Sequence, residues 1–195
     1  MKHVRGIILK HHGRRLIVLE EGGQRVDLYV TYHVSYARLS EGVVISYSAQ
    51  CDGKQKLSIS QPALEYFPLI LARHDIVFLH TLLELCYYFV PEGSCSRGVF
   101  DFFIEIYELS ENHIPFNKKL VICKLLTLVG QYPVSYELQS LIQRVSVTPI
   151  DKIGQSGIEL AEEELYDEWM RWCMTDHPYG RWFKAVPLFM KTGRV

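Results

Sequence analysis

The chain changes character at residues 62–68, which read Pro62-Ala63-Leu64-Glu65-Tyr66-Phe67-Pro68. Before this stretch, short runs of β-branched and aromatic residues alternate with glycines and basic residues. After it, long apolar runs recur at helical spacing and acidic residues become more frequent. We therefore expect an α+β protein with two domains, a β module at residues 1–68 and an all-α helical domain at residues 69–195.

Five runs before Pro62 predict β-strands, at residues 6–10, 15–20, 25–36, 42–48 and 56–60. Turns at residues 11–14, 21–24 and 51–54 separate several of them, and each contains a glycine. Alternation along these runs predicts one core-facing set: Leu28, Val30, Tyr32, Val34, Tyr36, Val43, Ile45, Tyr47, Leu57 and Ile59. Five short antiparallel strands favour a five-stranded barrel of the OB type. The number of strands does not define their connectivity, so an SH3-like barrel stays open.

The second part of the chain predicts helices at residues 75–89, 98–109, 117–129, 136–144 and 159–174. Proline and glycine at residues 91–93 end the first of these, and Gly130 suits the position just after the third. Residues 146–157 are rich in Thr, Pro, Gly and Ser and predict a loop. The aromatic residues of the tail, at 179–190, are expected to pack against the helices.

Basic residues concentrate in the β module. Residues 1–75 contain ten Lys and Arg against seven Asp and Glu, whereas residues 76–195 contain eleven against fifteen. Cations beside outward-facing aromatic rings would neutralise phosphates and stack bases, which favours nucleic acid as the ligand. The candidate nucleic-acid-binding residues are Arg5, Lys10, Arg14, Arg15, Arg25, Tyr29, His33, Arg38, Lys54 and Lys56. The competing interpretation is an ordinary solvated surface, because charged residues are common at turns.

The sequence gives little support to other classes of function. The five cysteines are scattered and form no Cys-x-x-Cys pair, so we expect reduced thiols and no metal site. No phosphate-binding loop, nucleophile elbow or zinc-protease helix is present, so we expect neither a cofactor nor an enzyme. The longest apolar run, at residues 76–90, falls short of the ~20 residues needed to span a bilayer. No signal peptide is apparent, and a cytoplasmic location without membrane partners is expected.

The order of several short motifs resembles the bacterial recombination mediator family RecO across nearly the whole chain. These motifs are Arg5-Gly6-Ile7-Ile8-Leu9-Lys10, Leu39-Ser40-Glu41-Gly42, Leu82-Leu83-Glu84-Leu85, Val90-Pro91-Glu92-Gly93, Val99-Phe100-Asp101-Phe102-Phe103, Lys124-Leu125-Leu126-Thr127-Leu128-Val129-Gly130-Gln131-Tyr132-Pro133 and Tyr179-Gly180-Arg181-Trp182-Phe183-Lys184. Many members of the family carry a four-cysteine zinc module after the Gly-x-x-Pro element, and this chain has no cysteines there. It would be a shortened member that lacks the zinc module.

The resemblance implies non-catalytic DNA handling in recombination and repair of DNA damage. Members of this family bind single- and double-stranded DNA, anneal complementary strands and work with RecR to load the recombinase. It also implies nucleoid association and a patch on the helical domain for the acidic C-terminal tail of single-strand-binding protein. Charge alone suggests four residues for that patch: Lys118, Lys119, Lys124 and Arg144.

Three alternatives to a DNA-binding mediator stay open. One is a protein-interaction adaptor of the same fold with little DNA affinity, because the net charge is only −1. Another is an unrelated RNA-binding OB protein, which would prefer RNA over matched DNA. The third is an enzyme, although no pair of carboxylates stands out as an acid and a base.

Overall fold

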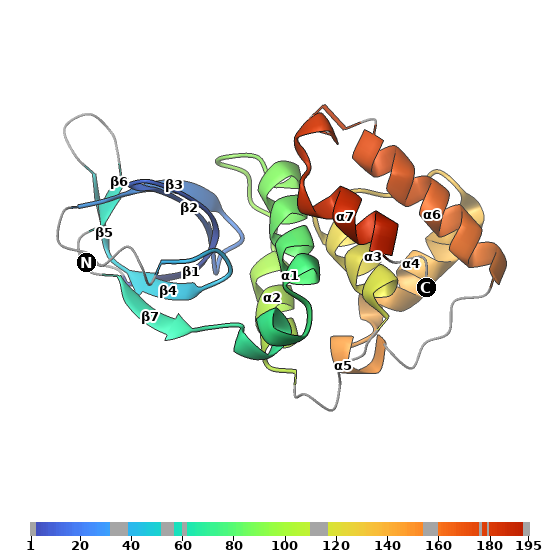
Figure 1. Ribbon diagram of the computed structural model, residues 1–195, viewed down its shortest axis with the longest axis horizontal. Helices are drawn as coiled ribbons and strands as arrows, with labels where there is room; N and C mark the ends of the chain where they lie inside the picture. The colour runs from blue at the N-terminus through green and yellow to red at the C-terminus, as the bar shows by residue number, and fades with distance from the viewer. Residues whose placement is uncertain are drawn as a thin grey trace.

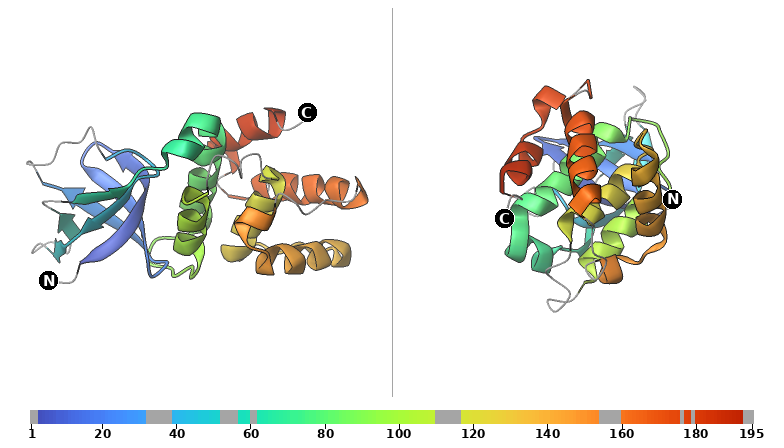
Figure 2. Two further views of the ribbon diagram at one scale, coloured as in Figure 1. Left: turned by 90° about the horizontal axis from the view of Figure 1, so that it is seen from below. Right: turned by 90° about the vertical axis from the view of Figure 1, so that its right-hand side faces the viewer.

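The computed structural model describes residues 3–31, 39–51, 57–59, 62–109, 117–153, 160–175, 177–178 and 180–192. A curled sheet at the N-terminal end of the molecule is followed by a body of helices (Figure 1). Two further views show the sheet at one end and the helices at the other, with α1 (Leu69–Phe89) between the sheet and most of the body (Figure 2). The predicted α+β organisation is confirmed.

The described part of the sheet has seven strands. In chain order they are β1 (Val4–His12), β2 (Arg15–Glu20), β3 (Arg25–Val30), β4 (Val44–Tyr47), β5 (Ala49–Cys51), β6 (Leu57–Ile59) and β7 (Ala63–Tyr66). Their order across the sheet is β5-β6-β3-β2-β1-β4-β7. All neighbours are antiparallel except β3 and β6, which are parallel.

The prediction of a five-stranded antiparallel barrel is therefore wrong in its strand count and in one pairing. The predicted run at 42–48 corresponds to β4, which pairs with β1, and a further strand, β5, follows it after Ser48 and pairs with β6. Residues 63–66, read as a boundary, instead form β7 on the outer edge of β4. Strand pairing joins residues distant in sequence, and hydrophobic alternation does not report it. Most of the third predicted run beyond Val30 lies outside the described residues.

The two faces of the sheet belong to different apolar clusters. An inner cluster gathers inside the curl: Ile8, Leu16, Val18, Leu28, Val30, Leu39, Val43, Ile45, Tyr47 and Ile59. The described members of the predicted core set lie in this cluster, with Leu57 packed against it. The opposite face contributes Ile7, Leu9, Leu19 and Val44 to a second cluster shared with the helices. We call this second cluster the shared core.

The helical body is built around α1. The other helices are α2 (Val99–Tyr107), α3 (Lys118–Leu128), α4 (Tyr136–Val147), α5 (Ile150–Ile153), α6 (Leu160–Thr175) and α7 (Ala185–Thr192), with a 3₁₀ turn η3 at Gly180–Trp182. Non-helical angles at Asp75 break α1, and its Oδ1 accepts a hydrogen bond from Phe78 N at 2.8 Å, so Asp75 caps the main part of the helix. The predicted start at residue 75 corresponds to this break, and α1 itself begins earlier, at Leu69.

Two expectations for the C-terminal part need correction. The predicted loop at 146–157 contains α5, whose Ile150 and Ile153 are buried. In the tail, Phe183, Val186 and Phe189 pack into the shared core, but Trp182 and Leu188 are each 54% exposed. Helical periodicity predicted an apolar face without defining how far neighbouring elements would cover it.

Candidate functional site

Two of the predicted DNA-binding arginines are held by carboxylates. Arg5 donates from Nε to Glu65 at 2.7 Å and from Nη1 to Glu21 at 3.1 Å. Arg15 pairs with Asp27 on the adjacent strand β3. Hydrogen bonding to these carboxylates raises the pKa of both guanidinium groups. Their positive charge is therefore largely balanced within the sheet.

Two other predicted cations face the helical body rather than solvent. Arg25 Nη1 donates to the carbonyl oxygens of Tyr87 at 2.6 Å and Val90 at 2.8 Å, where α1 ends. Its guanidinium carbon lies 4.6 Å from the centroid of the Tyr87 ring, and Lys10 Nζ lies 4.7 Å from the same centroid. A cation at these carbonyls is favourable because a helix carries partial negative charge at its C-terminus. Arg25 thus joins β3 to α1.

The remaining sheet residues are not gathered on one surface. Arg14 is exposed at the tip of the β1–β2 hairpin, at the opposite end of this ladder from Arg5. Tyr29 is half-buried and pairs in register with Arg15. Four predicted residues lie outside the described residues: His33, Arg38, Lys54 and Lys56. The structure thus brings Lys10 and Arg25 together at the ring of Tyr87, whereas Arg5 is held by Glu65 and Glu21.

Lys118, Lys119 and Lys124 of the predicted partner-binding patch contact carboxylates or carbonyl oxygens of neighbouring elements. Lys118 pairs with Asp75, and Lys119 pairs with Glu163 at 2.7 Å and Asp167 at 3.0 Å. Lys124 Nζ donates to three carbonyl oxygens at the end of α4, at 3.5, 3.2 and 2.6 Å, those of Val145, Ser146 and Thr148. Burial lowers the pKa of Lys124. These cations hold helices together.

Arg144, the fourth, lines an apolar groove of about 390 Å³ among α3, α4 and α5. The other lining residues are Leu120, Leu141, Val145, Val147, Thr148 and Ile153. Val147 is 82% exposed, so apolar surface continues out of the groove. We call this feature the α4 groove.

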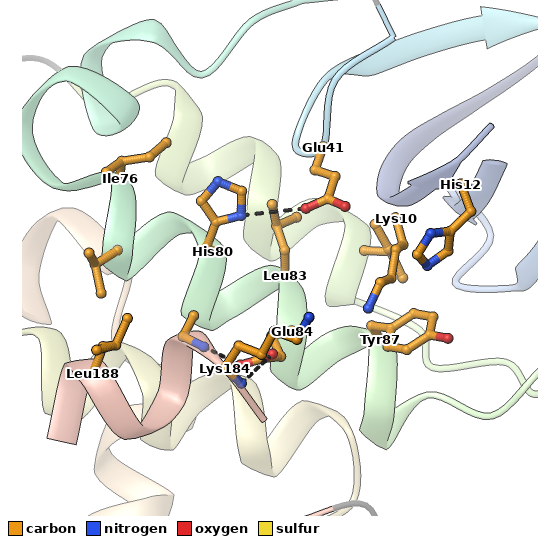
Figure 3. A pocket seen from close by; sticks show the side chains of 13 residues that line it. Lys10, His12, Glu41, Ile76, His80, Leu83, Glu84, Tyr87, Lys184 and Leu188 are labelled. Atoms are coloured by element: carbon orange, nitrogen blue, oxygen red, sulfur yellow. Dashed lines mark hydrogen bonds and ion pairs between the residues drawn. The ribbon is translucent and has the colours of Figure 1, made fainter. Parts of the chain in front are cut away.

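A larger cleft of about 480 Å³ lies where β1 meets α1 and the start of α7 (Figure 3). It is lined by Leu9, Lys10, His12, Glu41, Ile76, Val77, His80, Leu83, Glu84, Tyr87, Lys184, Ala185 and Leu188. We call it the sheet–helix cleft. Its volume is within the range of ligand-binding pockets, roughly 300–1,000 Å³.

The two acids of the sheet–helix cleft are engaged by the protein itself. Glu41 Oε2 lies 3.5 Å from His80 Nδ1 (Figure 3), and its other oxygen accepts from His11 N at 3.5 Å. The hydrogen bond between these side chains lowers the pKa of Glu41 and raises that of His80. The Glu84 carboxylate accepts backbone N–H groups of Lys184, Ala185 and Val186 at 2.7, 2.8 and 3.1 Å. It caps α7 from a residue of α1.

Among the polar residues that line this cleft, the sequence analysis named only Lys10 as a candidate binding residue. It did not name His12, Glu41, His80, Glu84 or Lys184. A bulge in β1 is responsible for part of the omission, since Ile8 pairs with Val18 and Lys10 pairs with Ile17, leaving Leu9 as an extra residue. The adjacent histidines His11 and His12 were the one available signal. Adjacent residues of a strand point to opposite faces, so this pair gives no reason to place either histidine in a site.

Comparison with models of known protein families and with curated proteins found no match. Within the described ranges, no helix has the length and apolar character needed to cross a membrane. Function is therefore inferred from the geometry of the chain.

Proposed function

We propose that the chain is a non-catalytic DNA-binding mediator of recombination and repair of the RecO type, with an OB-type N-terminal module. The pairing of the strands carries the proposal. If residues 44–51 count as one strand, β1 pairs with β2 and β4, β3 pairs with β2 and β6, and β5 returns to β6. This order of neighbours supports an OB-type arrangement, with β7 added at the edge of β4.

The β1–β2 hairpin is the part of the module best suited to phosphate contact. Arg14 and His12 are exposed there, and Lys10 lies on the same hairpin. Arg5 and Arg15 are paired with carboxylates, and Arg25 donates to carbonyl oxygens of α1. Annealing requires cations that screen the repulsion between two strands while leaving base edges free. The proposal includes a cytoplasmic, nucleoid-associated location. It also includes joint action with RecR on single- and double-stranded DNA.

The α4 groove is the proposed contact for the C-terminal tail of single-strand-binding protein. An acidic tail with apolar residues needs a hydrophobic surface beside a cation, and Leu141, Val145 and Arg144 supply both. Lys118, Lys119 and Lys124 contribute to the surrounding helix packing instead.

Fluorescence anisotropy with a labelled single-stranded oligonucleotide at two salt concentrations tests the DNA-binding function. We expect binding that weakens with salt, and a reduced salt slope for Arg14→Gln, because a phosphate contact is lost. Arg5→Gln is the matched control from the same sheet. Absence of binding at low salt would exclude the DNA-binding function.

A protein-interaction adaptor is the second candidate, favoured by a specific observation. Arg5, Arg15, Lys118 and Lys119 are all paired with carboxylates, which reduces the positive charge that DNA could use. Recovery of protein partners through the α4 groove, with no oligonucleotide shift at low salt, would support the adaptor. Loss of that recovery in Arg144→Glu would locate the contact.

A further inference from the structure

The bulge in β1 changes which way the end of the strand faces. Ile7 and Leu9 belong to the shared core, and Ile8 belongs to the inner cluster. Strict alternation would turn Lys10 and His12 toward the inside of the curl together with Ile8. Because Leu9 is an extra residue, Lys10 and His12 instead join Leu9 in lining the sheet–helix cleft.

The cleft contains two lysines, Lys10 and Lys184, beside its two acids. Glu41 is occupied by His80 and Glu84 by the N-terminus of α7. Lys184 is exposed, and its side chain forms no ion pair with another described residue. Lys10 Nζ lies over the rings of Tyr87 and Tyr88, and its charge also contributes to the lowered pKa of Glu41. Figure 3 shows Lys10 beside the Tyr87 ring at the mouth of the cleft.

The opposite wall of the cleft is apolar and open. Ile76 on α1 and Leu188 on α7 are 47% and 54% exposed, and Leu83 is buried next to Gly42. A ligand that fills this space must therefore carry an anionic group next to an apolar or aromatic body.

The line of cations that leads out of the cleft favours a polyanion over a single carboxylate. Lys10 is followed on the same hairpin by His12, which also lines the cleft, and by exposed Arg14 at its tip. A chain with one phosphate per unit could use each of these positions in turn, whereas one acidic side chain would use only the cleft. Stacking of a base against an apolar or aromatic surface adds affinity without demanding a particular sequence.

We propose that the sheet–helix cleft binds one nucleotide unit of a single-stranded nucleic acid. Its phosphate contacts Lys10 and Lys184, its base lies against Ile76 and Leu188, and the strand continues over His12 and Arg14. This assignment rests on the proposed DNA-binding function, and it moves the principal contact from the rim of the sheet to the junction of the sheet and helices.

The charge arm of the test is the double variant Lys10→Gln/Lys184→Gln, titrated with a labelled oligo(dT) over a series of salt concentrations. Both lysines are proposed to contact one phosphate. Loss of that contact should reduce the slope of log affinity against log salt by ~0.7. The control Arg97→Gln/Lys152→Gln removes two exposed charges outside the cleft and should keep the parent slope. Circular dichroism of each variant checks that it is folded.

The apolar arm compares Leu188→Asp with Leu69→Asp, since both leucines are exposed but only Leu188 lines the cleft. We expect Leu188→Asp to weaken oligo(dT) binding at least several-fold more than Leu69→Asp. Unlabelled oligo(dT) should displace the probe, whereas polyglutamate of equal charge should not.

Parent-like affinity and slope in both the charge and the apolar variants would overturn the cleft assignment while leaving the DNA-binding function in place. Displacement by polyglutamate would overturn the choice of a nucleotide as the ligand. If the parent protein does not bind oligo(dT) at all, the proposed function itself fails.

Discussion

Single basic residues that look alike in the sequence have different roles in this protein. Arg14 is exposed at a hairpin tip, Arg15 pairs with Asp27 on the next strand, and Arg25 holds the end of α1. Arginine suits the third role because its planar guanidinium can donate to several acceptors and stack on an aromatic ring at once. Only contacts with distant parts of the chain distinguish these roles.

Replacement of Arg25 tests its structural role. We expect Arg25→Gln to lower the free energy of unfolding by about 1–3 kcal/mol, because two hydrogen bonds from a charged donor to the end of α1 are lost. Urea denaturation measures the change. Arg97→Gln, at an exposed position, should leave the midpoint nearly unchanged. An unaltered midpoint in Arg25→Gln would show that the contact between β3 and α1 does not stabilise the protein.

At the scale of elements, the turn between β2 and β3 is locked to the loop between α1 and α2. Gly23 accepts from Ser96 N at 2.9 Å, and Gln24 forms an isolated bridge with Cys95. Gly23 has φ +81°, and a Cβ at this position would overlap the carbonyl of Ser96. Both its backbone conformation and its surroundings therefore require glycine.

A pair of glycine substitutions separates these two requirements. Gly13 also has positive φ, but a Cβ there would meet nothing within 4 Å, so Gly13→Ala should cost about 1–2 kcal/mol for conformation alone. Gly23→Ala should cost a further ~1–3 kcal/mol, because the turn must move away from the loop. Urea midpoints of the two variants give the comparison. Equal losses of stability in the two variants would mean that the loop between α1 and α2 moves aside without cost.

The contact between Glu41 and His80 joins the connection before β4 to α1, and it depends on pH. The raised pKa of His80 means that its contribution to stability is present below the ordinary value of 6.5 and is lost as pH rises through the raised value. The lowered pKa of Glu41 means that its contribution is present above 4.5 and is lost as pH falls through the lowered value. Glu84 strengthens the shift of His80, and Lys10 strengthens that of Glu41. The pair is thus most stabilising between these two ordinary values.

We therefore expect His80→Gln to destabilise the protein more at about pH 5.5 than at about pH 8.5, because the stabilising charge on the imidazole is lost as pH rises through its raised pKa. Urea midpoints of parent and variant at each pH measure the difference. His12→Gln is the matched control, because His12 is exposed and has no ion pair among the described residues. If the effect of His80→Gln does not change with pH, the contact stabilises the protein through packing and not through charge.

At the scale of the whole molecule, the sheet and the helices share one core. Ile7, Leu9 and Leu19 are at most 2% exposed, and they pack in the same cluster as α1. Separating residues 1–68 from 69–195 would expose these side chains on one fragment and the matching face of α1 on the other. The two predicted domains therefore depend on each other for burial of apolar surface.

This dependence predicts a single cooperative unfolding transition for the intact chain. Hydrogen exchange of strand amides and fluorescence of the tryptophans, which all lie in the helical part, should report the same urea midpoint. The fragment of residues 69–195 should unfold at a lower urea concentration than the intact chain. A fragment with the parent midpoint would show that the helices fold independently of the sheet.

Local patterns in the sequence predicted what belongs to single elements. Alternation at Leu28 and Val30 and at Val43, Ile45 and Tyr47 identified side chains that fill the curl, because a strand turns every second residue to the same face. Helical spacing located α1 to α4 and α6 for the same kind of reason. It could not reveal β7, whose four residues become a strand only by pairing with β4.

The order of a sheet followed by helices, and part of the inner cluster, thus follow from the sequence itself, because neighbours along the backbone set the hydrophobic period. The partners of the charged groups came only with the folded molecule. Arg5 meets Glu65 across 60 residues, Arg25 meets Tyr87 across 62, and Glu84 meets Lys184 across 100. Such contacts depend on how whole elements pack, and a bulge of one residue at Leu9 is enough to turn Lys10 from one face of the sheet to the other.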